Sequence, residues 1–380
     1  MSKYKITLTP VDKFFFGGDM TFQIGTDEKD SINRQYSSYI IQSNYIPQQT
    51  SLLGMLRFLI LRNAGKDVFE NNTIQDFQES GNLIGPRSFS VGGINDFGCI
   101  SCISHVRILR VQDGTELEVA PLFGDIGSQT VEGNYNGRTI TVPDLTRDQY
   151  NAKDGLTCYL TDGQTLYKFE EQDKNGDAGI FVEDRRIGIA RSVKTGKTDD
   201  GALFKQVSYR FNNTRWGELR FLFEAEVEDL PNEKKLTEYN GQMVSIGADN
   251  SQFIIGITAV GENQQASSTD GSDDASAVSD NGSLCLLSPA FLSKKEVTEN
   301  TCFAITRLVP FRFLTDRTAE DGYNPKSYHI LNGRLKRSER YDLYAAGSVF
   351  YFKDAAQKQS FIEKLTAKKD FRQIGYNEYK

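Results

Sequence analysis

The segment from Arg185 to Phe211 constrains the fold of this chain more than any other stretch. Its second arm, 202–211, ends in a run from Val207 that alternates apolar and polar side chains, the period of two typical of a strand with one solvated face. A stretch rich in turn-forming residues, Ser192 to Gly201, separates it from a first arm at 186–190. The pattern predicts a long β-hairpin whose tip projects from the body of the protein.

The first arm and the tip of this hairpin carry five cations against two carboxylates, in a chain whose formal net charge is −7. An acidic protein that concentrates cations on a protruding hairpin presents them to an anionic partner, and nucleic-acid phosphate is the commonest such partner. The alternative is a solvated hairpin whose cations pair with neighbouring carboxylates. The cations are Arg185, Arg186, Arg191, Lys194 and Lys197.

Length and composition describe an ordinary globular protein. With 380 residues, 38% of them hydrophobic, the chain has enough apolar material for one large domain or two smaller ones. The five cysteines are an odd number and no signal peptide is apparent, so we expect reduced thiols and a cytoplasmic location. The longest apolar run, 52–61, falls short of the roughly 20 residues that a membrane span needs.

A helix is predicted immediately after Pro47. Thr50 or Ser51 is expected to cap it, and the following residues up to Arg62 are apolar nearly all round, which indicates a buried helix packed on a sheet. Its N-terminus exposes backbone N–H groups and a partial positive charge, a natural site for phosphate. The alternative is a core helix with an ordinary cap, and both interpretations are compatible.

Residues that would indicate metal or acid–base chemistry are few. Cys99 and Cys102 form a lone Cys-x-x-Cys without a second pair at ligand spacing, so core cysteines are expected, with no metal site and no cofactor. The two histidines, His105 and His329, are interpreted as packed, hydrogen-bonded residues rather than catalytic ones. We therefore predict no catalytic residues.

Four stretches, taken in order, resemble the RAMP proteins of CRISPR effector complexes. The hairpin resembles their thumb, with Arg-Ile-Gly-Ile-x-Arg, a Lys/Thr/Gly tip and Asp-Gly-Ala-Leu-Phe; the closest resemblance is to subunit three of the type III-B (Cmr) complex. The predicted helix after Pro47 resembles the family's Pro-x-Thr/Ser-x-x-x-Gly-x-x-Arg helix, with Gln49, Thr50, Ser51 and Arg57 on the matching stretch. Residues 245–250 resemble a degenerate glycine turn that lacks the second Gly and the Arg, and 345–352 resemble the closing glycine-rich segment with its aromatic strand.

The resemblance implies an α+β fold made of two ferredoxin-like (βαββαβ, RRM-like) units, with the thumb and loop insertions. The units are expected at 1–215, including the thumb at about 185–211, and at 216–380. The polar segment 261–283 has almost no apolar residues and is expected to be a disordered loop between two strands of the second unit.

The function that this resemblance implies is a non-catalytic RNA-binding subunit in antiviral defence. It would grip the 5′ repeat-derived handle of the CRISPR RNA and bridge the large polymerase-like subunit to the neighbouring RAMP backbone subunit. The thumb tip would insert between bases, with Ile187, Ile189 and Val193 supplying apolar surface. The expected RNA-binding residues are Gln49, Thr50, Ser51, Arg57, Arg185, Arg186, Arg191, Lys194, Lys197, Ser245, Gly247 and Gly347.

Two other classes of function stay open at this point. A RAMP endoribonuclease that processes CRISPR RNA would use a histidine as acid or base, and His105 is the candidate. A protein scaffold without RNA contact would fit the acidic total charge but would leave the basic hairpin unexplained.

Overall fold

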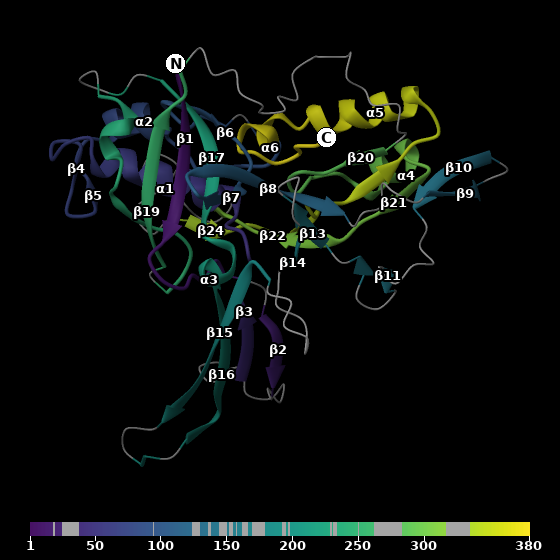
Figure 1. Cartoon of the computed structure of the whole chain (residues 1–380). Coiled ribbons are helices and arrows are strands. Elements are labelled where there is room, and N and C mark those ends of the chain that lie inside the picture. The colour runs from purple at the N-terminus through teal and green to yellow at the C-terminus, as the bar shows by residue number, and fades with distance from the viewer. Residues whose placement is uncertain are drawn as a thin grey trace.

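The computed structural model (Figure 1) is a mixed α+β protein built mostly from antiparallel strands, so the predicted α+β class is confirmed. Among the described residues, no helix combines the length and the apolar character that a bilayer span requires. The structure describes residues 1–17, 20–24, 38–93, 95–123, 130–135, 138–143, 150–151, 155–156, 158–161, 166–168, 179–191, 195–196, 198–228, 230, 234–249, 251–261, 283–316 and 335–380.

A nine-stranded sheet forms the body, and its central strand is β1 (Ser2–Pro10). β1 pairs in antiparallel fashion with β17 (Glu218–Val227) on one side and with β19 (Gln252–Ala259) on the other. The alternate side chains of β1 that face the core are buried, as the period of two predicts. The order is β14 (Leu166–Lys168), β13 (Cys158–Thr161), β8 (Thr115–Phe123), β7 (Arg107–Gln112), β17, β1, β19 and β18 (Met243–Ser245), with β6 (Ile100–Ile103) also paired to β17.

The predicted helix after Pro47 is α1 (Gln49–Arg62), and it packs into the main core together with α2 (Phe77–Ile84). The expected cap at Thr50 or Ser51 is wrong. The carbonyl of Gln48 already accepts hydrogen bonds from the N–H groups of Ser51 and Leu52, at 2.9 and 3.1 Å, so the helical ladder begins before either predicted cap. Between the two helices lies a short hairpin of β4 (Phe69–Glu70) and β5 (Thr73–Ile74).

A second, smaller sheet has the order β20 (Ser283–Cys285), β26 (Val349–Tyr351) and β21 (Phe303–Ile305). Its helices α4 (Lys294–Asn300) and α5 (Ala355–Thr366) bury Phe350, Phe361 and Leu365 in a core of its own. The chain end extends this sheet, because Cys285 and Lys380 exchange backbone hydrogen bonds of 2.9 and 3.0 Å.

These two sheets divide the chain at a place other than the predicted one. Strands β17 and β19 lie after residue 215 yet flank β1, so the main sheet crosses the boundary expected at 215/216. The polar segment expected to join two strands of one unit is instead flanked by β19 and β20, which belong to different sheets. Residues 262–282 of that segment lie outside the described residues.

The predicted hairpin consists of β15 (Phe181–Arg191) and β16 (Thr198–Phe211), paired in antiparallel register from Phe181–Phe211 to Arg191–Thr198. Two strands that sequence patterns did not reveal widen it. β3 (Ser38–Gln42) runs parallel to β16, and β2 (Met20–Ile24) pairs with β3. This four-stranded thumb sheet projects from the body in Figure 1, with β15 along one edge.

The remaining elements are short and connect or cover the two sheets. A short helix, α3 (Asn213–Trp216), follows the thumb, and a single 3₁₀ turn, η2 (Leu236–Tyr239), precedes β18. The paired strands are β9 (Thr130–Tyr135) with β10 (Arg138–Pro143), β11 (Tyr150–Asn151) with β12 (Gly155–Leu156), β22 (Leu308–Phe311) with β25 (Tyr341–Tyr344), and β23 (Leu314–Asp316) with β24 (Leu335–Arg337).

The C-terminal region after α5 fastens the second sheet to the body. It includes α6 (Lys369–Gln373), and Phe371, Ile374 and Tyr376 are buried in the main core rather than in the smaller one. Gln49 Nε2 donates to the carbonyl of Ile374 and to that of Ser104, both at 2.8 Å. One side chain therefore links the start of α1, the main sheet and the chain end.

We expect Gly375→Ala to destabilise the protein more than Gly114→Ala. Both glycines have positive φ, +81° and +78°, so both alanines pay the left-handed strain of about 1 kcal/mol. A Cβ at Gly375 would also meet Gln49 Nε2 at 2.1 Å and the His105 nitrogen at 2.5 Å, whereas at Gly114 nothing lies within 4 Å. Urea unfolding should show a further loss of about 2 kcal/mol for Gly375→Ala. An equal loss of unfolding free energy in the two variants would mean that Gly375 is not tightly packed against Gln49 and His105.

Candidate nucleic-acid interface

Two hollows lie near the residues that the sequence singled out, and among the predicted RNA contacts Gln49 lines one and Arg186 the other. The first, which we call the thumb-root hollow, has a volume of about 210 Å³ and lies where the thumb sheet joins the body. Three separate stretches meet there: the turn after β1, the root of the hairpin and the turn after β18. Its lining residues are Val11, Asp12, Lys13, Phe14, Phe15, Arg186, Ser208, Asp249, Ser251 and Gln252.

The turn after β18 requires a glycine at position 247. Gly247 has a φ of +88°, and a Cβ there would lie 2.3 Å from the carbonyl oxygen of Phe15. The neighbouring N–H of Ala248 donates to that same oxygen at 2.8 Å, and Ser251 Oγ accepts from the Phe15 N–H at 2.9 Å. The predicted glycine turn is thereby held against the residues that follow β1. Ser245, another predicted RNA contact, is exposed and lies two residues before Gly247.

The charges of the thumb root are mixed. Arg186 is exposed and lines the hollow together with Asp12 and Asp249, and the Asp249 carboxylate accepts a hydrogen bond from the Gln206 side chain. Lys13 Nζ pairs with Asp184 at 2.7 Å. The hollow therefore offers the Arg186 guanidinium beside carboxylate acceptors. The guanidinium can bind a phosphate, and the carboxylates can accept hydrogen bonds from a ribose hydroxyl or a base amino group.

The other predicted thumb cations differ in their situation. Arg185 Nε donates to Glu183 Oε2 at 2.6 Å on the same strand, so for this residue the alternative of a cation paired with a neighbouring carboxylate is correct. Arg191 ends β15 opposite Thr198, at a register position near the tip. Lys194 and Lys197 lie outside the described residues.

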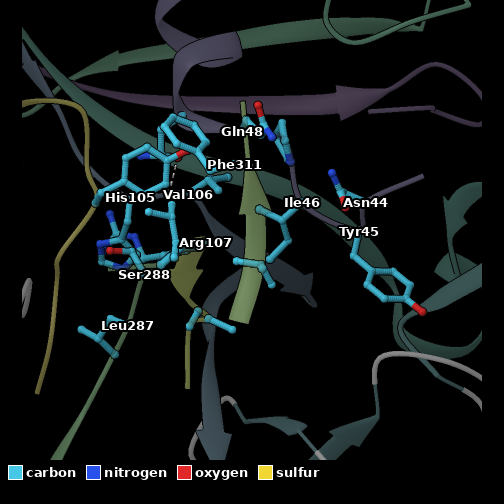
Figure 2. A pocket seen from close by; sticks show the side chains of 18 of the residues that line it. Asn44, Tyr45, Ile46, Gln48, His105, Val106, Arg107, Leu287, Ser288 and Phe311 are labelled. Carbon is cyan, nitrogen blue, oxygen red and sulfur yellow. Dashed lines mark hydrogen bonds between the residues drawn. The ribbon is translucent and has the colours of Figure 1, made fainter. Parts of the chain in front are cut away.

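The second hollow, which we call the seam cavity, has a volume of about 240 Å³ and lies between the main sheet and the smaller one. Its walls come from the start of α1, the start of β7, strands β22 and β25, and the turn at 345–346. Figure 2 shows two sides of the cavity. Of the residues labelled there, His105, Val106, Arg107, Leu287 and Ser288 lie on one side and Asn44, Tyr45 and Ile46 on the other, and Gln48 and Phe311 are labelled as well.

Two predicted RNA contacts are buried in protein instead. Gln49 is 3% exposed, and besides its two donated bonds its Oε1 accepts from the Val106 N–H at 3.3 Å. Arg57 is 6% exposed and donates through Nη2 to the carbonyls of Gly85 and Arg87 at 3.0 and 2.8 Å. Both side chains satisfy main-chain groups inside the fold. Sequence spacing did not reveal this, since exposure depends on how distant segments pack.

The other residues predicted near the seam differ in exposure, and Gly347 is buried. Ser51 is exposed and Thr50 half-buried in the first turn of α1. Gly347 has a φ of +81°, and its N–H donates to the carbonyl of Leu286 at 2.6 Å, so this amide joins β20 to the turn. The turn presents Ala345 and Ala346, rather than Gly347, to the cavity.

Charged residues that sequence reasoning missed also line the seam cavity. Arg107 pairs with Glu118 at 2.9 Å and with Glu224 at 3.2 Å, while Arg307 is exposed at the rim. Burial and, to a smaller extent, the positive charge of Arg107 lower the pKa of His105 to about 4, while Glu224 opposes both. His105 is therefore neutral at pH 7 and a weak base. The other histidine, His329, lies outside the described residues.

Cys99 and Cys102, the predicted core cysteines, are not reactive thiols. Burial raises the pKa of the Cys99 thiol to about 11 and that of Cys102 to about 12, so both remain protonated at neutral pH. Within the described part of the chain, no group of three or more His, Cys, Asp or Glu side chains is arranged to hold a metal ion.

The loop 43–48 connects the two hollows. At its start the N–H of Ser43 donates to the Val207 carbonyl at 2.9 Å, and Asn44 Nδ2 donates to the Gly17 carbonyl at 2.7 Å, both at the thumb root. The ring of Tyr45 lies 4.4 Å from that of Tyr209. From Asn44 onwards the same loop lines the seam cavity. The loop therefore leads along the chain from the thumb root to the start of α1, and we call this path the track.

The model of one protein family, described as "CRISPR-associated protein (Cas_Cmr3)", matches residues 6–379. The chain belongs to the CRISPR-associated Cmr3 family. The resemblance seen in the sequence, to subunit three of the type III-B CRISPR effector complex, is thereby confirmed. No curated protein matches the chain.

Solved structures similar to this Cmr3-family chain come from type III-B complexes. One, described as the cryo-EM structure of the type III-B Cmr-beta bound to cognate target RNA, is 13% identical and has a TM-score of 0.48, covering 98% of this chain and 95% of that one. A second, with target RNA and AMPPnP in state 1, is 14% identical with a TM-score of 0.46, covering 98% and 94%. An apo-state chain is 10% identical with a TM-score of 0.29, covering 69% and 98%.

The low pKa of His105 predicts a pH dependence of stability. Between pH 6.5 and about 4 the unfolded chain binds a proton at this histidine that the folded protein does not, so the free energy of unfolding falls as the pH falls through this window. His105→Gln removes this contribution. From pH 7 to pH 5 the wild type should lose about 1 kcal/mol more stability than the variant, a value reduced from the full linkage because the ring keeps some solvent contact. Parallel loss in both proteins would contradict the assignment.

Proposed function

We propose that this chain is the non-catalytic subunit that grips the single-stranded 5′ handle of the CRISPR RNA in its type III-B effector complex. The observation that carries the proposal is the path of residues 43–48, which leave the thumb root close to the first hollow and line the seam cavity up to the start of α1. An exposed guanidinium, Arg186, lies at one end and the N-terminus of a long helix at the other. Such groups suit an extended sugar–phosphate strand.

The contacts differ in kind along this track. At the root, Arg186 is the cation in the hollow and Asp12 and Asp249 are acceptors for ribose hydroxyls or base amino groups. Near the tip, Arg191, Lys194 and Lys197 add the positive charge expected to follow the phosphates. At α1, Thr50 and Ser51 replace the buried Gln49 and Arg57 as the candidate contacts, and Ser245, Gly247 and Gly347 act through the backbone turns that they shape.

The strand orders support two ferredoxin-like units. In the body the sequence β1, α1, β7, β17, η2, β19 gives the spatial order β19-β1-β17-β7, with the first strand between the third and the fourth. In the smaller sheet the sequence β20, α4, β21, β26, α5 and residues 378–380 gives the same arrangement, with the chain end beside β20. We place the units at about 2–259 and 283–380, with β2, β3 and the thumb hairpin inserted in the first.

In this proposal the subunit bridges two protein neighbours, the large polymerase-like subunit and the adjacent RAMP backbone subunit, and serves antiviral defence. On the body, basic side chains form ion pairs with the protein's own carboxylates. The RNA track is therefore a local feature of a protein that is acidic overall. A chain that bound RNA over its whole surface would need a positive total charge, whereas a local grip does not.

The alternative of a RAMP endoribonuclease rests on His105, which lines the seam cavity. With a pKa near 4 this imidazole is a poor base at neutral pH. We expect the purified chain to leave CRISPR repeat RNA intact over hours of incubation at pH 7.5, as followed on denaturing gels. Time-dependent fragments that His105→Ala abolishes would establish the enzyme instead.

Charge reversal at the thumb root tests the RNA grip directly. Arg186→Glu should weaken binding of handle RNA about tenfold at moderate salt and reduce the salt dependence of the affinity by about 0.7 in log–log slope, the share of one phosphate on a single strand. The matched control is Lys295→Glu on α4, which makes the same change in net charge at a side chain that is 80% exposed. Fluorescence anisotropy across a salt series measures both quantities.

The comparison between these two variants decides the outcome. An unchanged affinity and slope for Arg186→Glu, or an equal effect of Lys295→Glu, would favour a protein scaffold without a local RNA track. Adding Arg191→Glu and Lys194→Glu should deepen the loss if the strand continues toward the tip.

A further inference from the structure

The two faces of the thumb hairpin differ in their chemistry. Residues opposite each other in an antiparallel pair point to the same face, and successive residues alternate between faces. Arg186 pairs with Gln206 and Asp184 with Ser208, and Arg186 and Ser208 both line the thumb-root hollow, so this is the polar face. The other face, which we call the isoleucine face, carries Ile187 opposite Lys205, Ile189 opposite Leu203, and Arg185 opposite Val207.

The isoleucine face continues the core out into solvent. At the root its residues are buried, with Tyr209 at 0% and Val207 at 5% exposure. Toward the tip, Ile187 is 71% exposed and Ile189 is 50% exposed. Adjacent aliphatic side chains so open to water are the usual mark of an interaction surface rather than of a solvated strand.

The backbone beside these side chains is also open. β15 is the outer strand of the thumb sheet, and in the described part of the chain no strand pairs with its other edge. Natural proteins usually protect a long edge strand, because its unpaired N–H and C=O groups are a template for another strand. Residues 185–191 contain three arginines and no carboxylate, so their charge repels basic segments and attracts acidic ones.

We propose that an extended acidic segment of a neighbouring protein in the complex adds to β15 as a further strand and covers Ile187 and Ile189. The segment carries apolar side chains that pack on the two isoleucines and Asp or Glu residues that meet Arg185 on the same face. The two isoleucines are then the apolar centre of the contact and the Arg185–Glu183 pair is part of its polar rim.

A protein strand fits this face better than RNA does. Unstacked bases are held on aromatic rings or on the plane of a guanidinium. The guanidinium of this face belongs to Arg185, which Glu183 holds, and the exposed apolar groups are branched aliphatic side chains. In this proposal the RNA lies on the polar face with Arg186, and Ile187 and Ile189 contact protein instead of inserting between bases. The proposal does not depend on the RNA grip, because it uses the opposite face.

The experiment uses the whole complex, assembled in cells and purified through a tag on the N-terminus of this chain. The double variant Ile187→Asp/Ile189→Asp should lower the co-purification of at least one neighbouring subunit about tenfold. Ile187→Thr/Ile189→Thr, which keeps β-branched side chains, should lower it less. The control is Ile254→Asp on β19, a side chain that is 46% exposed on the body and should leave assembly unchanged. Circular dichroism establishes that each variant is folded.

A photo-crosslinking benzophenone side chain in place of Ile187 identifies the occupant. We expect a crosslink to one protein subunit, mapped by mass spectrometry to an acidic segment with alternating apolar residues. A crosslink to the RNA, or normal assembly of the double Asp variant, would overturn the proposal. The RNA affinity of the free chain should stay within twofold of wild type in the isoleucine variants. If the RNA affinity of the isoleucine variants falls as much as that of Arg186→Glu, the isoleucine face is an RNA surface and the proposal is wrong. If Arg186→Glu binds RNA as tightly as wild type, only the proposed RNA grip is refuted.

Discussion

The pairing of β1 with β17 and β19 positions everything else in the molecule. It joins the first ten residues to strands that begin at Glu218 and Gln252, and it buries Ile6 and Leu8 completely. Because β1 is fixed between them, the residues that follow it are brought against the Gly247 turn and the thumb root. The thumb leaves the body just before β17, so both the track and the hairpin depend on this central strand.

The distribution of charge explains how an acidic chain can still hold RNA. On the body, Lys3 and Arg107 share Glu224, Arg107 also pairs with Glu118, and Arg220 pairs with Glu218. These pairs neutralise the sheet locally and contribute little individually to stability where they are exposed. The cations of the thumb are distributed differently, with Arg185 held by Glu183 on its own strand and Arg186 facing the hollow.

Local sequence patterns predicted the helices and strands, whereas contacts between distant segments determine which of their side chains are exposed. The alternation at 207–211 and the glycines of the hairpin gave β15 and β16, and the apolar run after Pro47 gave α1. The requirement for Gly247 was visible in the sequence as a turn, but not its contact with Phe15. The burial of Gln49 and Arg57, the seam cavity and its arginines, and the strands β2 and β3 beside the hairpin all arise from contacts between distant segments, which carry no local signal.

The position of β1 has a consequence for synthesis on the ribosome. Leu8 pairs with Phe221 and Ile255, so this apolar strand emerges more than two hundred residues before its partners. A nascent chain of this kind carries an unpaired hydrophobic segment throughout most of its translation, and such non-local topologies fold slowly and aggregate readily. The main sheet therefore cannot close until β17 and β19 have both been synthesised.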